Sequence, residues 1–230
     1  MRPTIVFDLD GTLVDTAPDL VDSLNHCLIT QGLTPAREED IRHYAGHGAR
    51  VMLQRAFEAQ DRLAELSEEM LGTLLDVFID HYRKNIPGRS QPFPGAVAAM
   101  DRFAAAGWAL AVCTNKFEGL AIPLLEGLGV KHRFAAIAGS DTFAYRKPDP
   151  RHLTDTITAA GGDWRNSILI GDSRTDVTTA KAAGVAVVAV TFGYSDTPVA
   201  DLAPDHVIDH FDELTTALAS ELIACMAKPK

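Results

Sequence analysis

The amino-acid sequence predicts an α/β protein, with a doubly wound parallel sheet as its core and a small helical domain inserted after the first strand. Two observations support this fold class. Short, continuously apolar runs recur through the second half of the chain, and a helix-like stretch ending in glycine precedes each of them. Residues 16–87 break that rhythm and show apolar residues at helical spacing instead. Continuous apolar strands that alternate with helices indicate a parallel sheet covered on both faces.

The apolar runs predict five strands. They lie at residues 4–7, 108–113, 134–138, 167–170 and 185–190. The glycines before the later runs supply the left-handed turn that closes a helix. A sixth, weaker strand is expected at residues 206–208, followed by a closing helix with Leu214, Leu218 and Leu222 on one face. Strand–helix units repeated in this way are typical of a Rossmann-like core.

The inserted segment begins at Thr16. Thr16, Pro18 and Asp19 form a typical helix start, and leucines at positions 20, 24 and 28 follow at helical spacing. Prolines and glycines at residues 87–88 and 92–95 mark the return to the sheet. We therefore expect residues 1–15 and 88–230 to form the α/β core. Residues 16–87 would form a helical cap, joined to the core by two linkers that could act as hinges.

The composition narrows the class of function. The 230 residues carry a formal net charge of -10, which argues against non-specific binding to nucleic acid or to an anionic membrane. No apolar run approaches the roughly 20 residues of a membrane span. The three cysteines do not suggest a disulfide framework, and no signal-like apolar segment opens the chain. We expect a cytoplasmic protein, and its oligomeric state, monomer or homodimer, is left open.

Polar residues follow the predicted strands at the edge of the sheet where ligands bind in open parallel sheets. They are Asp8 and Asp10 after the first strand, Thr114 and Asn115 after the second, Lys147 after the third, and Asp172 and Asp176 after the fourth. Clustered carboxylates repel one another and need a cation, and oxygen ligands favour a hard one such as Mg²⁺. Together with Lys147, such a cation would let an acidic protein accept a phosphate dianion.

These motifs, taken in order, resemble those of the haloacid-dehalogenase-like hydrolase superfamily. They are Asp-x-Asp-Gly-Thr from Asp8, the Thr at position 114, Lys147-Pro, and Gly-Asp-x-x-x-Asp ending at Asp176. The resemblance covers essentially the whole chain, and the inserted helices look like the cap of that superfamily. It implies that Asp8 is the nucleophile that forms an aspartyl-phosphate. Asp10 would protonate the leaving alcohol and then activate water.

The resemblance also implies a phosphate site and a metal site. Thr114, helped by Asn115, would bind a phosphate oxygen, and Lys147 would neutralise charge on the transferring group. Mg²⁺ would be held by Asp8, by the backbone carbonyl of Asp10 and by Asp172. Asp176 would be a further ligand or would orient the others. Asp15 is left out of the catalytic set, because a helix-capping role explains it about as well as chemistry does. We expect it to belong to the hinge where the chain leaves the core for the cap.

An Asp at position 10 favours a phosphomonoester hydrolase or a phosphomutase over the dehalogenases and phosphonatases of the superfamily, which need no acid for a leaving alcohol. Residues 7–20, 46–52, 171–176 and 191–194 most resemble bacterial phosphatases that act on 2-phosphoglycolate. In the cap, Gly46, His47 and Gly48 form a turn that brings backbone close to a ligand, and Arg50 is a candidate for the substrate's carboxylate. A surface salt bridge is the alternative role for Arg50.

Other substrates and another class of function remain open. Related phosphatases act on sugar phosphates such as N-acetylmuramic acid 6-phosphate, or on nucleoside monophosphates, and short motifs separate these poorly. Signalling receiver domains also gather acids, a Thr and a Lys around Mg²⁺ on a doubly wound sheet. A receiver is about half this length and has no inserted cap. Steady Mg²⁺-dependent release of phosphate would exclude such a switch.

Overall fold

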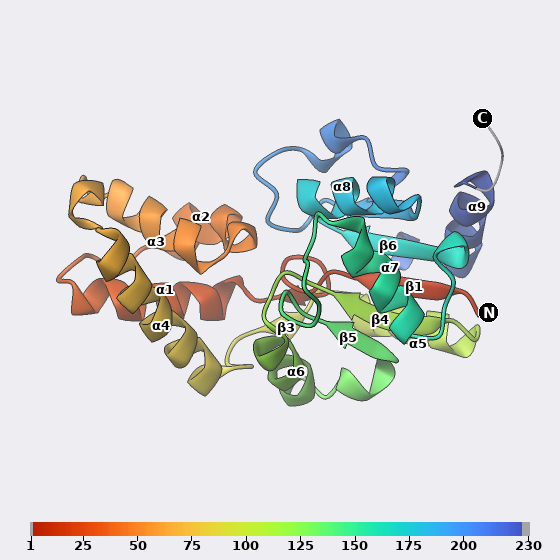
Figure 1. Ribbon diagram of the computed structural model, residues 1–230, viewed down its shortest axis with the longest axis horizontal. Coiled ribbons are helices and arrows are strands. Elements are labelled where there is room, and N and C mark those ends of the chain that lie inside the picture. Colours follow the sequence, from red (N-terminus) through yellow and green to blue (C-terminus); the bar gives the residue numbers. More distant parts are fainter. Residues whose placement is uncertain (1, 227–230) are drawn as a thin grey trace.

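The computed structural model describes residues 2–226, and its core is one parallel sheet of six strands (Figure 1). The strand order is β5-β4-β1-β6-β7-β8, and every neighbouring pair is parallel. The strands are β1 (Thr4–Phe7), β4 (Ala109–Cys113), β5 (Ala136–Ala138), β6 (Ser167–Gly171), β7 (Ala186–Val190) and β8 (His206–Ile208). The predicted fold class is confirmed, including the weak sixth strand.

Helices cover both faces of this sheet, as continuous apolar strands require. They are α5 (Ala96–Ala105), α6 (Glu118–Gly127), α7 (Pro150–Ala159), α8 (Arg174–Ala183) and α9 (Thr216–Met226). Successive side chains of a strand point to opposite faces. Accordingly, Val6 of β1 packs in a buried cluster with residues of α7 and α8. Ile5 and Phe7 belong to a second cluster, which contains buried residues of α5, α6 and α9.

The chain crosses from one half of the sheet to the other around β1. Strands β4 and β5 lie on one side of β1, and β6, β7 and β8 lie on the other. In open α/β sheets, the crevice outside the carboxyl ends of the strands at such a switch point is where ligands bind. The topology therefore directs the search for a site to the residues that follow β1, β4 and β6.

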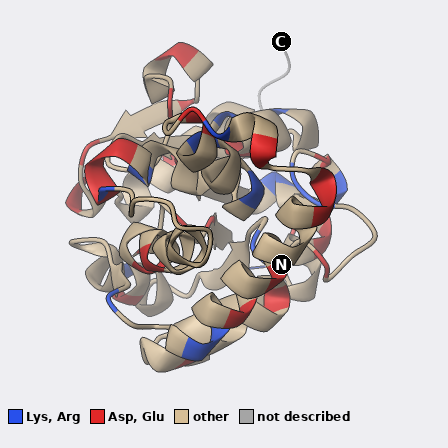
Figure 2. Cartoon of the chain, turned by 90° about the vertical axis from the view of Figure 1, so that its left-hand side faces the viewer, with Lys and Arg blue, Asp and Glu red and all other residues tan. Residues whose placement is uncertain are grey.

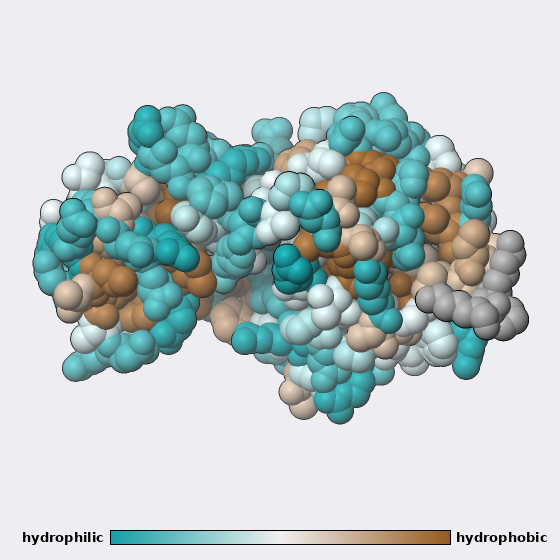
Figure 3. All heavy atoms as spheres, turned by 90° about the horizontal axis from the view of Figure 1, so that it is seen from above, coloured by the Kyte–Doolittle hydropathy of each residue, from teal (hydrophilic) through white to brown (hydrophobic). Residues whose placement is uncertain are grey.

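Four α-helices lie between β1 and the core helix α5 in sequence, and we call them the cap helices. They are α1 (Ala17–Thr30), α2 (Glu38–Ile41), α3 (Ala49–Glu58) and α4 (Glu68–Asn85), joined by the short 3-10 helices η1 (Arg42–His47) and η2 (Leu63–Glu65). They stand beside the carboxyl ends of the strands as a separate lobe (Figure 1), and the surface narrows between the two lobes (Figure 3). Leu24 and Leu28 of α1 are buried in this lobe, together with Leu74 and Phe78 of α4.

A small second sheet ties together the two segments that connect the lobes. Strand β2 (Val14–Asp15) pairs antiparallel with β3 (Gln91–Pro92). The carboxylate of Asp19 accepts hydrogen bonds from the backbone N–H groups of Arg89 and Ser90, at 2.7 and 2.9 Å. The sequence patterns did not predict this pairing, because strands of two residues carry no readable periodicity.

The closing helix differs from its prediction. Helix α9 begins at Thr216, so Leu214 lies before it in a turn and is buried there. Ala219 and Ile223 form the buried face of the helix, in place of the expected leucine stripe. The helix begins two residues after Leu214, so a four-residue repeat counted from Leu214 does not follow the buried face of the helix.

Charged residues are distributed over the helices, with acidic and basic groups interspersed in the view from the cap end (Figure 2). Among the residues that the structure describes, no helix combines the length and the apolar character needed to cross a bilayer. The free thiols of Cys27, Cys113 and Cys225 form no disulfide within this part of the chain.

Candidate active site

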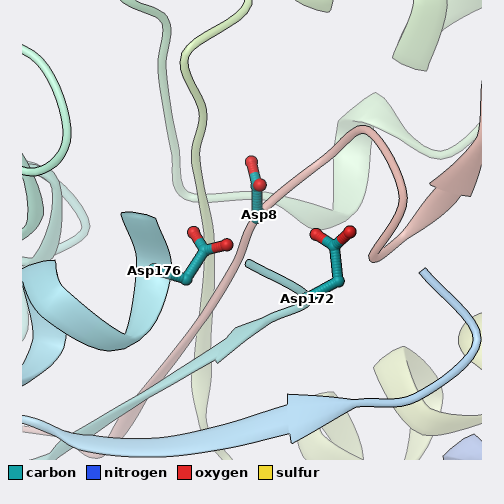
Figure 4. Close-up of side chains that lie close together, drawn as sticks. All are labelled: Asp8, Asp172 and Asp176. Carbon is teal, nitrogen blue, oxygen red and sulfur yellow. The ribbon is translucent and has the colours of Figure 1, made fainter. Parts of the chain in front are cut away.

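Three carboxylates meet at the carboxyl edge of the sheet. Asp8 follows β1, Asp172 follows β6, and Asp176 lies in the first turn of α8 (Figure 4). One oxygen of each carboxylate lies within 4.8 Å of the corresponding oxygens of the other two. All of these donors are oxygens, as a hard divalent cation such as Mg²⁺ requires. The residues present therefore fit a divalent-metal site.

Three glycines around these carboxylates have no side chain, and this makes room for the acids. A Cβ atom at Gly171 would lie 2.3 Å from the Cβ of Asp176, and one at Gly193 would lie 2.2 Å from the Cβ of Asp172. A Cβ at Gly11 would lie 2.6 Å from Asp172 Oδ2. Side chains at these three positions would displace the acids, so the glycines are part of how the chain builds the cluster.

Burial and mutual repulsion make the cluster costly to ionise. Burial raises the pKa of Asp172 to about 8, with Asp176 and Asp8 adding to the effect. Burial likewise raises the pKa of Asp8 to about 6, although Lys147 acts in the opposite direction. The Asp172 carboxylate is held by Thr12 Oγ1 at 2.9 Å and by the backbone N–H of Tyr194 at 2.7 Å. A divalent cation would favour the ionised carboxylates and reverse this tendency.

Lys147 lies between two of the acids. Its Nζ is 2.9 Å from Asp8 Oδ1 and 2.6 Å from Asp176 Oδ1, and 1% of its side chain is exposed. Although burial opposes its charge, the two carboxylates hold its pKa above the ordinary lysine value. The amide of Asn115 donates to the backbone carbonyl of Lys147 at 3.0 Å. Asn115 thus fixes the loop that carries the lysine.

Thr114 directly follows β4 and is buried. Its backbone N–H donates to Ala138 O at 3.0 Å, so the residue continues the ladder between β4 and β5. Its hydroxyl oxygen accepts a hydrogen bond from the backbone N–H of Lys116 at 3.2 Å. The threonine is therefore rigidly placed at the edge of the sheet where the aspartates lie.

The carboxylate of Asp10 has a different environment from the other acids. It accepts hydrogen bonds from Thr16 Oγ1 at 2.7 Å and from Lys116 Nζ at 2.9 and 3.3 Å. Thr16 does precede α1, as expected, but it makes no side-chain cap, because its hydroxyl is used on Asp10. Sequence reasoning missed Lys116 as a site residue. Its place directly after Thr114 and Asn115 was the available signal.

Asp176 is also tied to its own helix. Its carboxylate accepts a hydrogen bond from the backbone N–H of Ser173, and its own backbone N–H donates to Ser173 Oγ, so the two residues form a capping box at the start of α8. The Ser173 hydroxyl also donates to the Asp176 carboxylate. With Lys147 on its other oxygen, both carboxylate oxygens have protein partners. These contacts suit a residue that orients the cluster.

Asp15 lies where the chain leaves the core. Its carboxylate accepts hydrogen bonds from Tyr194 Oη at 2.7 Å and from Arg42 Nη2 at 2.6 Å. The same tyrosine hydroxyl accepts hydrogen bonds from the backbone N–H groups of Thr16 and Ala17. Asp15 therefore links a cap arginine to a core loop, a position that suits the hinge role considered for it.

The charged side chains predicted in the cap, Arg50 and His47, pair with acids outside the aspartate cluster. Arg50 pairs with Glu68 at 3.0 Å, and 51% of its side chain is exposed. His47 Nε2 lies 3.6 Å from Asp196 Oδ2, and a Cβ at Gly46 would lie 3.4 Å from that of Tyr194. Gly48 has a positive φ of 84° just before α3. The turn approaches the core, whereas Arg50 makes its ion pair within the cap.

Comparison with known proteins gives consistent results. A family model described as haloacid dehalogenase-like hydrolase matches residues 5–190. A phosphoglycolate phosphatase of Mesorhizobium japonicum is 57% identical, over 96% of this chain and 97% of that protein. One of Agrobacterium fabrum is 51% identical, over 97% and 95%. The crystal structure of a predicted phosphoglycolate phosphatase from Haemophilus somnus 129PT has a TM-score of 0.84 at 33% identity and covers 93% of this chain and 96% of that one. These similarities span both the sheet and the cap helices.

Proposed function

The chain belongs to the haloacid dehalogenase-like hydrolase family, and we propose that it is a Mg²⁺-dependent phosphatase that hydrolyses 2-phosphoglycolate. The observation that supports this choice of substrate is the near full-length identity of 57% and 51% to two proteins named phosphoglycolate phosphatase. The chemistry is supported by a nucleophile candidate, an acid candidate and a cation-binding cluster at one sheet edge.

Asp8 is the nucleophile in this proposal. The backbone N–H of Leu9 and Lys147 Nζ both contact its Oδ1, at 2.7 and 2.9 Å, and so fix the carboxylate's orientation. The other oxygen attacks phosphorus and forms the new P–O bond of an aspartyl-phosphate while the bond to the leaving oxygen breaks. Lys147 stabilises the charge on the transferring group, and Thr114 holds one of its oxygens.

Asp10 moves the proton. In the first step its carboxylic acid donates a proton to the leaving oxygen, which departs as the alcohol of glycolate. In the second step its carboxylate accepts a proton from the water that attacks phosphorus, and Asp8 is released together with inorganic phosphate. Thr16 and Lys116 orient the Asp10 side chain through their hydrogen bonds to it.

The metal belongs to the strand-end cluster. Asp8, the backbone carbonyl of Asp10 and Asp172 would hold Mg²⁺, and Asp176 would orient the cluster through its bonds to Lys147 and Ser173. When bound, the cation neutralises the acids and polarises the phosphoryl group. The all-oxygen donor set favours Mg²⁺ over metals that prefer nitrogen or sulfur ligands.

The cap helices have a gating role in this account. We divide the chain into a core of residues 1–15 and 88–230, described as far as residue 226, and a cap of residues 16–87. The cap opens to admit substrate, closes to exclude bulk water during phosphoryl transfer, and reopens for release. Unpaired thiols fit a reducing compartment, so we also propose a cytoplasmic enzyme.

A panel of phosphomonoesters tests the proposal. The purified protein is assayed with Mg²⁺ on 2-phosphoglycolate, N-acetylmuramic acid 6-phosphate, nucleoside monophosphates and β-glucose 1-phosphate, and the products are identified. We expect steady phosphate release and the highest kcat/KM on 2-phosphoglycolate. Preference for another ester would reject the substrate, an isomerised sugar phosphate would indicate a mutase, and a single turnover would indicate a phospho-aspartate switch.

A further inference from the structure

Lys116 is a buried cation at the junction of the core and the cap helices. Only 6% of its side chain is exposed, and its Nζ contacts both oxygens of Asp10. The same Nζ lies 4.3 Å from the centre of the Tyr82 ring. Tyr82 is on α4, so the lysine is enclosed between a cap residue and the proposed catalytic acid.

Tyr82 carries a polar atom without a partner at this junction. The residue is 1% exposed, and its hydroxyl has no hydrogen-bond partner among residues 2–226. Buried hydroxyls are nearly always satisfied, and leaving one unpaired is costly. Burial raises the pKa of this hydroxyl to about 12, so it is a hydrogen-bond donor at neutral pH. An acceptor that is absent from the protein itself would satisfy it.

The proposed substrate brings such an acceptor to this place. In 2-phosphoglycolate a single methylene separates the carboxylate from the leaving oxygen. Asp10 must approach that oxygen to within about 2.6–3.2 Å to protonate it. A cation that is hydrogen-bonded to Asp10 is therefore within reach of the substrate's carboxylate. Lys116 is that cation, with Nζ 2.9 Å from Asp10 Oδ1.

The other cations considered for this role are engaged elsewhere. Lys147 is held between Asp8 and Asp176, and Arg50 is paired with Glu68 on an exposed face. We infer that Lys116, with the Tyr82 hydroxyl, binds the carboxylate of the substrate and sets the preference for a small carboxylated phosphate ester. This inference rests on the proposed function and moves the carboxylate site from Arg50 to the core–cap junction.

A pair of matched substrates separates this role from a general effect on Asp10. Ethyl phosphate has a methyl group where 2-phosphoglycolate has its carboxylate, and otherwise presents the same leaving oxygen. The ratio of kcat/KM for 2-phosphoglycolate to that for ethyl phosphate is measured for the wild type and for Lys116→Met, Tyr82→Phe and Arg50→Ala. Loss of orientation at Asp10 affects both substrates, so it cancels in the ratio.

We expect Lys116→Met to lower the ratio by about 10- to 100-fold, the range for a lost hydrogen bond to a charged group. Tyr82→Phe should lower it by about 10-fold, the lower end of the same range, because the hydroxyl donates to the same carboxylate. Arg50→Ala should leave it unchanged. Circular dichroism and thermal unfolding check that each variant folds. If Lys116→Met does not fold, Tyr82→Phe alone decides, because it removes only the hydroxyl.

Two failures can be told apart. If the wild type does not prefer 2-phosphoglycolate, the proposed function fails and the inference falls with it. Suppose instead that the wild type prefers 2-phosphoglycolate. The inference alone is then overturned if Lys116→Met lowers both kcat/KM values equally, or if Tyr82→Phe leaves their ratio unchanged. A ratio that falls with Arg50→Ala would return the carboxylate to the cap arginine.

Discussion

Replacing Gly193 by alanine tests whether close packing around Asp172 builds the metal site. Gly193 lies in the loop after β7, and a Cβ there would lie 2.2 Å from Asp172 Cβ and 2.4 Å from Asp172 Oδ2. Nonbonded atoms do not approach so closely, so the loop or the aspartate must move. No positive φ occurs at Gly193, so the substitution isolates the contact with Asp172 from backbone strain.

The expected size of the effect follows from the contacts of Asp172. The backbone N–H of Tyr194, the neighbour of Gly193, donates to Asp172 Oδ2 at 2.7 Å, so a loop shift also breaks this bond. Overpacking a buried position costs about 1–3 kcal/mol of the free energy of unfolding. Disturbing the support of a metal ligand lowers metal affinity by about 10- to 100-fold. We expect both losses in Gly193→Ala.

The assay is isothermal titration with Mg²⁺, together with urea unfolding. Gly72→Ala is the matched control, because Gly72 lies inside α4 and a Cβ there meets nothing within 4 Å. The control should keep the Mg²⁺ affinity of the wild type and gain up to about 1 kcal/mol of stability from helix propensity. If Gly193→Ala binds Mg²⁺ as tightly as Gly72→Ala does, the packing account of the site is wrong.

Three further outcomes are expected. The pKa values of Asp172 and Asp8 in the folded protein, about 8 and about 6, lie above the ordinary 3.8, so the folded metal-free protein holds protons that the unfolded chain releases. The stability of the metal-free protein should therefore fall from pH 4 to pH 8. In thermal-shift assays, the rise in Tm on adding Mg²⁺ should be larger at pH 8 than at pH 6, and equal rises would contradict this. Lys147→Met leaves buried carboxylates without their cation. It should cost about 3–5 kcal/mol in urea unfolding and at least roughly 100-fold in kcat, and near-normal phosphate release would exclude its proposed role. Tyr194→Phe leaves the backbone N–H of Thr16 without its acceptor and should cost about 1–3 kcal/mol of unfolding free energy; unchanged urea midpoints would show that this junction contributes little.

The strand-end residues could be predicted because strand order and direction place them. Asp8, Thr114 and Asp172 each follow a continuously apolar run, and parallel strands bring such positions to one edge. The six parallel strands were readable for the same reason. These inferences need only periodicity and the direction of the strands.

Side-chain contacts between the lobes, and between helices of the cap, could not be predicted in this way. Tyr82 lies in the last part of α4, and its position over Lys116 depends on how the cap helices sit against the core. The pairing of Arg50 with Glu68 likewise depends on the packing of α3 beside α4. A helix-start pattern at Thr16 cannot say that its hydroxyl will bond to Asp10 instead of capping the helix. Such choices are set by tertiary structure.

Direct detection of the phosphorylated nucleophile tests the central claim most sharply. The enzyme is mixed with 2-phosphoglycolate and Mg²⁺, quenched in acid during turnover, digested, and analysed by mass spectrometry. We expect one phosphoryl group on the peptide that contains Asp8 and none in Asp8→Asn, which should fold normally and release no phosphate above background. A phosphoryl group on another residue, or near-wild-type hydrolysis by Asp8→Asn, would contradict the account.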